Sequence, residues 1–590
     1  MKQFFKFTSA SILGTLIALF IAFAGMFLFL AIVVSVLGAE ETVTISDNTV
    51  LEIELNYSIP ERTTYEPAGN FSLFIPEFAK EIGVNDIIQN IQKAQYDPKI
   101  AAIFLNLNNF IGGSYANIHS IREALIRFKN SGKMLIAHGH RISQKAYYLA
   151  SGADKIYLSP TGELDIRGIS LQATFFKKTL DKLEIEPQIF QAGKYKSAVE
   201  TFSHEKMSEA NREQLNDLID SYYAEIVSEI SNMRGINEED LKLIIENYKS
   251  RNTAELMDLN LVDGLKYYDE VVDEMKRNIG IQSERNVNKV RLHEYDNVAF
   301  SDGEYSKNRI AVIYANGEIH EGKGDEYSIG MENITKELSK ARKNKNVKAI
   351  VLRVNSPGGS PLTSEMILRE CKLAAEIKPV IASFGEVAAS GGYYISAGCT
   401  EIYSDPFTIT GSIGAFGIIP NMQKFFDDKL GITFDSVDKG KYAGLYNLAK
   451  PLTGEERTII QSKVDTIYNT FLKRVAAGRN MPVESINEIA QGRVWSGINA
   501  KEIGLVDEIG GLEQAVIAAA DNAGIDRYEI IEYPSIKEPL EKFMELLTTE
   551  TKTLFSFLSR SNLAELIHET KNYILERGIL TRIPIDIYVD

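Results

Sequence analysis

An internal repeat constrains the fold of this chain most, because a pattern that occurs twice calls for the same architecture twice. The segment SQKAYYLASGADKIYLSPTGELDIRG (143–168) aligns without a gap with ASGGYYISAGCTEIYSDPFTITGSIG (389–414), at a constant offset of 246 residues. Seven of the 26 aligned positions are identical: Tyr147/Tyr393, Tyr148/Tyr394, Gly152/Gly398, Ile156/Ile402, Tyr157/Tyr403, Pro160/Pro406 and Gly168/Gly414. We therefore expect two domains of one fold.

The likeness continues on both sides of this segment. Upstream, AAIFLNLNNFIGGS (101–114) resembles KAIVLRVNSPGGS (348–360), with one extra residue in the first copy. Downstream, AELMDLNLVDGL (254–265) resembles AKEIGLVDEIGGL (500–512). Each copy therefore extends over some 250 residues.

The polar, turn-prone segment SDGEYSKN (301–308) separates the two copies. We place an N-terminal domain over 48–304 and a C-terminal domain over 305–530. We expect residues 531–590 to form a C-terminal extension. Its segment EPLEKFMELLTTETKTLFSFLSR (538–560) is amphipathic, which favours an interface or packing helix over the alternative, a second membrane anchor.

Short β-rich runs alternate with helical patterns in each copy. In the second copy, 309–319, 347–355 and 378–385 have strand character, whereas 332–344 and 361–377 carry apolar residues at helical spacing. This alternation predicts the α/β class, with a largely parallel and buried sheet in each domain.

The N-terminus predicts a membrane anchor over residues 1–40. Residues 7–39 carry no charge, whereas a spanning helix needs about 20 apolar residues and a cleaved signal has an apolar region of only about 7–15. Lys2 and Lys6 precede the run and Glu40 follows it, so the positive-inside rule leaves the short tail in the cytoplasm. A cleaved signal peptide ending near VLGA (36–39) is the alternative.

Composition excludes some classes of function. The formal charge of −16 argues against a general nucleic-acid binder, which would carry a basic surface. Cys371 and Cys399 are the only cysteines and have no metal-ligand spacing, and the chain contains neither a P-loop nor an H-E-x-x-H motif. We expect no metal and no cofactor.

Three small-residue motifs of the second copy point to acyl-transfer chemistry. Ser390 stands in AASGG (388–392), where we expect a strand to give way to a helix. The glycines of NSPGG (355–359) free backbone N–H groups to face a ligand, and such donors stabilise an oxyanion by several kcal/mol. A third turn, TGSIG (410–414), carries the hydroxyl of Ser412.

A nucleophilic serine needs a base, and the second copy offers no histidine near it. No histidine occurs between His320 and His568. His138 and His140, in AHGH, fit strand-end or packing positions better than a site, because H-x-H without further ligands is a weak signal.

Comparison of the two copies indicates a lysine as the base. Gln144 aligns with Ser390, and in the alignment of 191–202 with 438–449 Lys196 faces Ala443. The copy with the serine lacks the lysine, and the copy with the lysine lacks the serine, which leads to the hypothesis of one site assembled from both copies. Burial would favour the neutral form of the lysine, which can accept a proton. The alternative is that Lys196 is an ordinary solvated lysine.

Together, these motifs resemble those of the signal peptide peptidase A family in its long, tandem-domain bacterial form, within serine peptidase family S49. The segments are YKSAVETF (195–202), NSPGG (355–359), AASGGYYISAG (388–398) and TGSIGAFG (410–417). The resemblance runs from the anchor to about residue 530 and implies tandem domains of the Clp protease/crotonase-like fold, built from repeated ββα units.

Residue roles follow from the resemblance. It implies Ser390 as nucleophile, Lys196 as general base, Ser412 as hydrogen-bond partner of the lysine, backbone N–H groups of Gly358 and Gly391 as oxyanion hole, and Gly359 as support of that turn. The family has proline where this chain has Thr201, a loop difference that leaves the dyad intact.

The implied function is an endopeptidase that degrades remnant signal peptides and other apolar peptides. The resemblance implies a single-pass protein of the bacterial inner membrane, with its catalytic domains facing the periplasm, that forms a homo-oligomer, expected to be a tetramer. The partners are then peptide substrates and the bilayer. A crotonase-like enzyme acting on thioesters and an inactive membrane scaffold are the alternatives.

Overall fold

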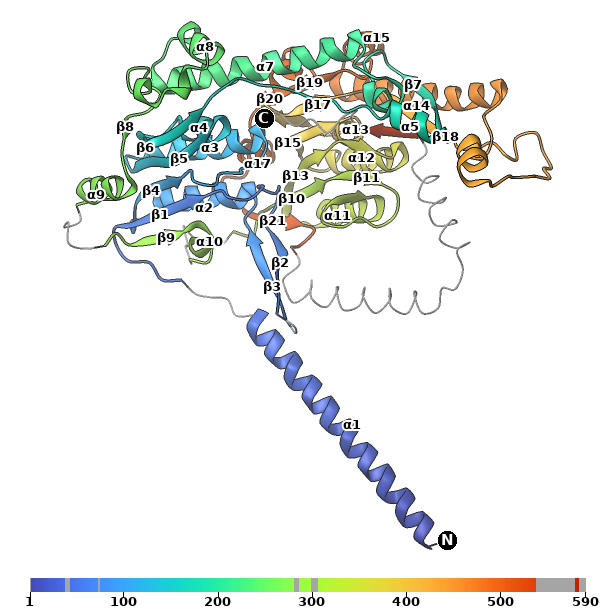
Figure 1. The fold of residues 1–590 in the computed structure, drawn as a ribbon, viewed down its shortest axis with the longest axis horizontal. Coiled ribbons are helices and arrows are strands. Elements are labelled where there is room, and N and C mark those ends of the chain that lie inside the picture. Colours follow the sequence, from blue (N-terminus) through green and yellow to red (C-terminus); the bar gives the residue numbers. More distant parts are fainter. Residues whose placement is uncertain are drawn as a thin grey trace.

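A computed structural model describes residues 2–37, 43–72, 75–280, 286–298, 306–536 and 579–582. Figure 1 shows a two-part α/β body from which the N-terminal helix α1 (Lys2–Leu37) projects. Over Lys6–Gly25 this helix is long and apolar enough to cross a membrane, by length and composition alone. Between helix and body stands a hairpin of β2 (Thr64–Ser72) and β3 (Ile75–Glu81).

A parallel six-stranded sheet, ordered β8-β6-β5-β4-β1-β9, forms the first half. Its strands are β1 (Thr49–Glu54), β4 (Ile100–Asn106), β5 (Met134–Ser143), β6 (Lys155–Asp165), β8 (Gly264–Leu265) and β9 (Lys289–Arg291). The helices around it are α2 (Val84–Tyr96), α3 (Tyr115–Asn130), α4 (Gln144–Ala150), α8 (Glu238–Glu246), α9 (Tyr268–Asn278) and α10 (Leu292–Tyr295). Central strand β4 is apolar from Ile100 to Leu105 because helices cover both faces of the sheet.

The second half repeats this order. Strands β21-β10-β13-β15-β16-β20 follow one another as β9-β1-β4-β5-β6-β8 do, and β17 and β19 extend the sheet beyond β15. Their bounds are β10 (Arg309–Asn316), β13 (Val347–Ser356), β15 (Val380–Ala389), β16 (Glu401–Ser404), β17 (Ile409–Gly411), β19 (Val494–Ser496), β20 (Glu508–Ile509) and β21 (Glu529–Tyr533). The associated helices are α11 (Met331–Lys343), α12 (Pro361–Ala375), α13 (Gly391–Ser396), α15 (Val483–Ile489), α16 (Gly497–Glu502) and α17 (Leu512–Ala523). The α/β prediction is confirmed.

A third sheet combines strands from both halves and positions the site. Its order is β12-β11-β14-β22-β18-β7. The bounds are β12 (Ser328–Gly330), β11 (Glu318–His320), β14 (Gly358–Gly359), β22 (Ile579–Arg582), β18 (Ala415–Asn421) and β7 (Glu186–Ala192). Strand β7, flanked by α5 (Lys177–Leu183) and α6 (Glu200–Ser203), belongs to the first half of the chain but pairs antiparallel with β18 of the second.

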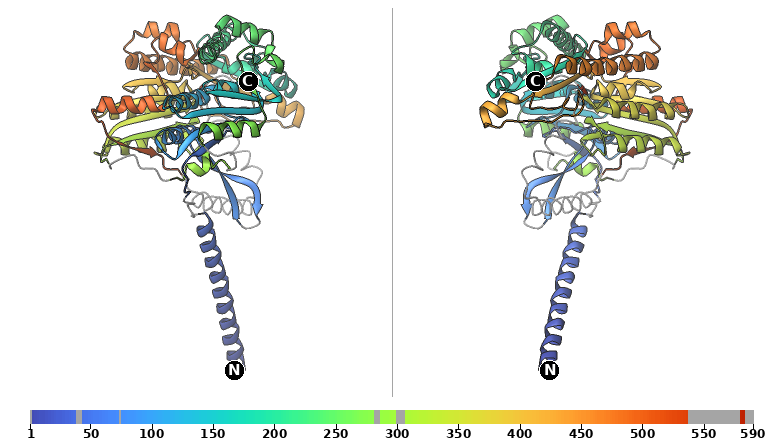
Figure 2. Two further views of the ribbon diagram at one scale, coloured as in Figure 1. Left: turned by 90° about the vertical axis from the view of Figure 1, so that its left-hand side faces the viewer. Right: turned by 90° about the vertical axis from the view of Figure 1, so that its right-hand side faces the viewer.

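Two long helices, α7 (Glu209–Arg234) and α14 (Gly454–Arg479), occupy equivalent places in the two copies. Helix α7 runs along the top of the body in Figure 1 and reaches the second half, where the Oγ atoms of Ser221 and Ser496 lie 2.7 Å apart. The side views of Figure 2 show the helices of both halves gathered at the end of the body opposite α1.

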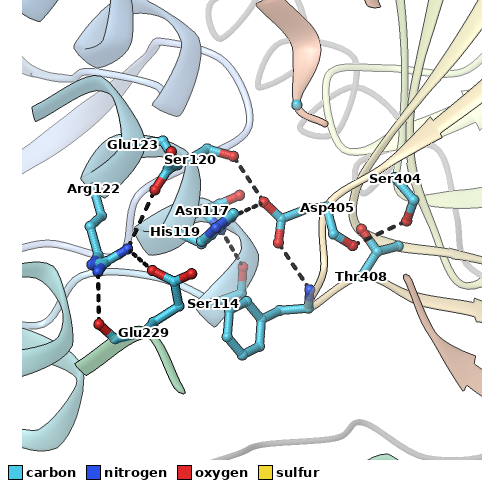
Figure 3. Close-up of polar contacts among 12 residues, drawn as sticks. Ser114, Asn117, His119, Ser120, Arg122, Glu123, Glu229, Ser404, Asp405 and Thr408 are labelled. Carbon is cyan, nitrogen blue, oxygen red and sulfur yellow. Dashed lines mark hydrogen bonds and ion pairs between the residues drawn. The ribbon is translucent and has the colours of Figure 1, made fainter. Parts of the chain in front are cut away.

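The halves also meet directly through Asp405, in the turn between β16 and β17. Figure 3 shows α3 facing this turn: His119 Nδ1 lies 2.8 Å from Asp405 Oδ2, and Ser120 Oγ donates to the same oxygen at 3.2 Å. The other carboxylate oxygen, Oδ1, accepts the Phe407 N–H at 3.0 Å. One buried carboxylate therefore links a helix of the first copy to a turn of the second.

We retain 48–304 and 305–530 as the proposed domain limits. Of the C-terminal extension proposed for 531–590, only 531–536 and 579–582 are described, and the four residues 579–582 form strand β22. The amphipathic segment that prompted the prediction lies outside the described residues.

Candidate active site

Ser390 lies in the turn where β15 ends and α13 begins, as the sequence predicted. Its side chain is fully buried, and its backbone has φ 55° and ψ −115°, a conformation that L-residues rarely adopt. The Ser390 N–H donates to Gly411 O at 2.8 Å. A Cβ on Gly392 would lie 2.6 Å from Ser356 O, so only glycine at this position lets the serine turn pack against the backbone of Ser356.

The register of β7 against β18 brings Lys196 to this turn. Ala192, the last residue of β7, pairs with Ala415, the first residue of β18. Lys196 follows Ala192 by four residues, and Ser412 precedes Ala415 by three. The two chain segments converge there, although one comes from each copy of the repeat.

Three oxygen atoms surround the lysine amine. Lys196 Nζ lies 2.8 Å from Ser390 Oγ, 2.9 Å from Ser412 Oγ and 2.9 Å from the Ser412 carbonyl oxygen. The lysine side chain is 1% exposed. The structure thus brings together the three side chains that the sequence singled out.

Burial lowers the pKa of Lys196 well below its ordinary value, because the ammonium form loses its hydration there. A neutral amine has two N–H donors and one lone pair. The Ser412 carbonyl can only accept one N–H and Ser412 Oγ can accept the other, so the lone pair is left to face the Ser390 hydroxyl. This arrangement can remove a proton from the serine.

The predicted oxyanion-hole glycines surround the same turn. A Cβ on Gly391 would lie 3.0 Å from Gly359 N and 3.1 Å from Gly358 Cα, so the three glycines are in close contact. Gly359 has φ 152°, and a Cβ there would lie 2.0 Å from Ile319 O, which only glycine avoids. Gly391 opens α13, where a helix leaves its first N–H groups without an intrahelical acceptor.

Gly358 differs from the expectation in one respect. Its N–H donates to Ser356 Oγ at 3.2 Å in this structure. Such a long bond to a neutral hydroxyl is weaker than one to a developing oxyanion. Gly358 can therefore serve the oxyanion hole only by sharing or releasing that donor.

Residues that the sequence did not single out hold the lysine in place. A Cβ on Gly492 would lie 2.6 Å from Lys196 Cβ, and one on Gly414 3.1 Å from Lys196 Cδ. Gln491 O accepts the Tyr195 N–H at 2.7 Å. Two glycines of the second copy thus make room for a lysine of the first.

Gln214, on α7, is the second such residue. Its Nε2 donates to Tyr195 O at 3.1 Å and to Ser197 Oγ at 3.0 Å, while its Oε1 accepts the Val494 N–H at 3.1 Å. One fully buried amide therefore joins the lysine loop to β19. No sequence motif marked it, because a glutamine on a polar helix has no pattern of its own.

Gln144, the residue of the first copy that aligns with Ser390, makes structural contacts instead. Gln144 Oε1 accepts the N–H groups of Arg167 and Gly168, at 3.1 and 2.9 Å, and Nε2 donates to Tyr115 at 3.1 Å. The amide thereby fills the place of a nucleophile with structural hydrogen bonds.

The two histidines of AHGH make local contacts in the first half. His138 Nε2 lies 3.2 Å from Lys266 O, and His140 Nδ1 lies 2.6 Å from Ser159 Oγ. Both contacts fit the packing role that the sequence suggested.

Comparison with known proteins gives a consistent result. The family described as Peptidase family S49 matches residues 127–282 and again residues 372–526, once in each copy of the repeat. Protease 4 of Salmonella typhi is 36% identical over 80% of this chain and 78% of that protein. Protease 4 of Haemophilus influenzae is 36% identical (74% and 72%), and the chloroplastic serine protease SPPA of Arabidopsis thaliana is 32% identical (80% and 70%).

Proposed function

Because the chain belongs to peptidase family S49 and is a serine peptidase, we propose that it cleaves remnant signal peptides and other apolar peptides with Ser390 as nucleophile and Lys196 as base. The observation that carries this proposal is the 2.8 Å contact of the Lys196 and Ser390 side chains, both buried. It lies within the range over which a base takes a proton directly.

In the first step, neutral Lys196 takes the hydroxyl proton as Ser390 Oγ attacks a peptide carbonyl. Ser412 holds the amine through its hydroxyl and carbonyl oxygens, which keeps the lone pair directed at Ser390. The resulting ammonium returns its proton to the leaving amine. The first product departs and the acyl group stays on Ser390.

The oxyanion of this step would accept N–H groups from Gly391 and Gly358. Attack on the carbonyl concentrates negative charge on its oxygen, which draws the Gly358 N–H away from Ser356 Oγ. In the second step a water molecule occupies the place of the leaving amine, Lys196 takes its proton, and the acyl-enzyme is hydrolysed.

We propose that α1 anchors the protein in the bacterial inner membrane, with the catalytic domains facing the periplasm. Lys2 and Lys6 lie before the apolar span, on the side that the positive-inside rule assigns to the cytoplasm. An anchored peptidase lies close to apolar peptides that remain in the bilayer, which fits the proposed substrate class.

We also propose a homo-oligomer, with four chains. The counterpart of β7 in the second copy, 433–439, forms no strand, and its Phe434 and Val437 are 59% and 97% exposed. The counterpart of β18 in the first copy, 169–175, forms no strand either. If 433–439 of one chain paired with 169–175 of the next, the β7–β18 contact would recur between chains, and such head-to-tail contacts can close into a ring.

A fluorophosphonate probe, which reacts with activated serines, tests the dyad. We expect it to label Ser390 in the detergent-solubilised chain, and labelling to be lost in Ser390→Ala and to collapse in Lys196→Ala. Lys194→Ala, two residues away and exposed, is the matched control and should label normally. Normal labelling of Lys196→Ala would exclude the dyad, and turnover of acyl thioesters but not peptides would favour a crotonase-like enzyme instead.

Light scattering after gel filtration tests the assembly. We expect a mass of four chains for the wild type and one chain when Phe434 and Val437 are both replaced by Asp. Ile377→Asp, at a residue 63% exposed elsewhere, serves as control and should leave the mass unchanged. A monomeric wild type would contradict the proposed oligomer.

A further inference from the structure

Arg493 lies beside the proposed dyad but takes no part in the catalytic steps. In the chain it follows Gly492, whose missing Cβ leaves room for Lys196, and it directly precedes β19. The carbonyl oxygen of Arg493 accepts the Ser412 N–H at 2.6 Å. The main chain of Arg493 therefore supports the turn whose two oxygen atoms hold the lysine amine, and its side chain is available for a second contact.

The Arg493 side chain contacts two aromatic rings. Its guanidinium carbon lies 4.8 Å from the centre of the Tyr195 ring and 4.6 Å from the centre of the Trp495 ring. Both distances are within the range over which the face of an aromatic ring attracts a guanidinium. Tyr195 directly precedes Lys196 in the first copy, whereas Trp495 belongs to β19 of the second. One cation therefore connects the two copies next to the lysine.

The two rings differ in how they are fixed. Trp495 Nε1 donates to Ile489 O at 3.0 Å, which holds the indole within the second copy. A Cβ on Gly411 would lie 2.7 Å from Trp495 Cδ1, so the indole also packs closely against the turn that carries the lysine partner. The Tyr195 ring, by contrast, stands on the turn segment 193–196. The guanidinium thus connects a fixed ring to the loop of the lysine.

Two carboxylates of α7 orient the guanidinium. Glu213 and Asp217 are four residues apart and therefore lie on one face of the helix. Arg493 Nη1 donates to Glu213 Oε1 at 3.3 Å, and Nη2 donates to Asp217 Oδ2. The Tyr195 hydroxyl donates to the same Glu213 oxygen at 3.0 Å. Because a guanidinium is planar and its donors have fixed directions, the two carboxylates hold it in contact with the Tyr195 ring.

A second cation contacts the same tyrosine without connecting the copies. Lys194 Nζ lies 4.7 Å from the centre of the Tyr195 ring and 3.2 Å from its hydroxyl oxygen. The Lys194 side chain is 62% exposed, whereas that of Arg493 is 16% exposed. Lys194 also belongs to the loop that it contacts. Of the two cations, Arg493 is therefore the one that can restrain this loop against the second copy.

From these contacts we propose that Arg493 is a positioning residue for Lys196, and that it acts by holding the Tyr195 ring. Its main chain keeps Ser412 in place and its side chain keeps the lysine loop in place, so one residue determines how closely the amine approaches the oxygen atoms around it. This inference rests on the proposed function of Ser390 and Lys196, to which it adds a residue that acts only through others.

Fluorophosphonate labelling of the detergent-solubilised chain tests the inference. Arg493→Gln removes the cation, and Tyr195→Leu removes the ring. We expect each variant to label Ser390 about tenfold more slowly or worse, because a displacement of about 1 Å can cost about 100-fold in rate. Since both changes break the same contact, the double variant should label about as slowly as the slower single variant.

Two further variants show whether the ring contact itself matters. Tyr195→Phe keeps the ring and should label within about threefold of the wild-type rate, because the ring rather than the hydroxyl contacts the guanidinium. Lys194→Ala removes the other cation from the same ring and is the matched control, which should label normally. A role of Tyr195 in stability alone would not distinguish the cation of Arg493 from that of Lys194.

Trp495 is the only tryptophan of the chain and gives a spectroscopic readout of the contact. Indole emission responds to the charged groups beside the ring, and the Arg493 guanidinium is such a group. Tyr195→Leu leaves the guanidinium without one of its two rings and should change the emission spectrum of Trp495. Tyr195→Phe and Lys194→Ala should leave that spectrum as it is in the wild type.

The outcomes separate this inference from the proposed function. Wild-type labelling rates in Arg493→Gln and Tyr195→Leu would overturn the positioning role and leave the dyad standing. Losses that multiply in the double variant would overturn it too, since the two side chains would then act independently. If Arg493→Gln does not fold, the comparison of Tyr195→Leu with Tyr195→Phe decides. Normal labelling of Lys196→Ala would instead overturn the proposed function.

Discussion

At the scale of single residues, glycine positions decide whether the lysine can reach the serine. Gly492 is the sharpest case, because its missing Cβ leaves the space that Lys196 Cβ occupies. Gly492 also has φ 77°, which an alanine tolerates poorly. The site therefore requires both Lys196 from the first copy and the absence of a Cβ atom at position 492 of the second copy.

Gly492→Ala should displace Lys196 by several tenths of an ångström or more, and a shift of about 1 Å in a catalytic group can cost about 100-fold in rate. We expect probe labelling of Ser390 to slow by at least tenfold. Gly235→Ala is the control, since Gly235 has a similar φ of 63° with no atom within 4 Å of the added Cβ. Equal labelling rates in the two variants would refute this role of Gly492.

The lowered pKa of Lys196 predicts the pH dependence of labelling. Only the neutral amine accepts a proton, so the labelling rate should rise with pH and then reach a plateau. The midpoint of this rise should lie well below about 10.4, the ordinary pKa of lysine. Lys196→Arg should be inactive throughout this range, because a guanidinium stays protonated. A midpoint at the ordinary lysine value would show that Lys196 is solvated when it acts.

At the scale of elements, two pieces of the first copy complete the second: strand β7, which sets the register of the lysine, and helix α7, which supports it. The buried amide of Gln214 connects the lysine loop and β19 through three hydrogen bonds. Removal of a side chain that satisfies several buried groups leaves each of them unpartnered, at about 1–3 kcal/mol per group.

Gln214→Leu should therefore destabilise the protein by at least about 1–3 kcal/mol, the cost of a single such group, and slow Ser390 labelling. Thermal unfolding and probe kinetics measure the two effects. The matched control is Gln461→Leu on α14, where an exposed glutamine donates to Gln191 O of β7 at 3.1 Å. The prediction fails if both variants label Ser390 at the wild-type rate.

The sequence predicted much of this arrangement, and the remainder has physical reasons. The repeat and its alternating pattern gave the two α/β domains, and the exchange of Ser390 and Lys196 between the copies gave the pair. The pairing of β7 with β18 was not predictable, because strand pairing between domains depends on register over more than 200 residues of separation. Gly492 and Gln214 were not predictable either, because their contacts exist only after that pairing.

At the scale of the whole molecule, the contact of α3 with Asp405 adds a pH-sensitive link between the halves. Burial by itself would lower the pKa of His119, but the Asp405 carboxylate outweighs it, and Glu123 adds in the same direction, so the pKa is raised. Arg122 opposes this shift, and Glu225 on α7 is a further nearby carboxylate. The protonated histidine is favoured in the folded protein.

Because the folded pKa exceeds the unfolded one, the stabilisation is fully present below about pH 6.5 and is lost as pH rises through the folded value. We expect the thermal midpoint of the wild type to exceed that of His119→Gln at pH 6, and the difference to shrink by pH 9. A constant difference across that range would mean that His119 does not titrate in this contact.

The crossing of β7 into the second half has a consequence for biogenesis. During translation, Lys196 leaves the ribosome almost 200 residues before Ser390, and β7, the strand that precedes it, lacks its partner β18 until the second copy is made. A nascent or prematurely terminated chain therefore holds the proposed base without the proposed nucleophile. The order of synthesis therefore keeps the two side chains apart until β18 of the second copy has been made and can pair with β7.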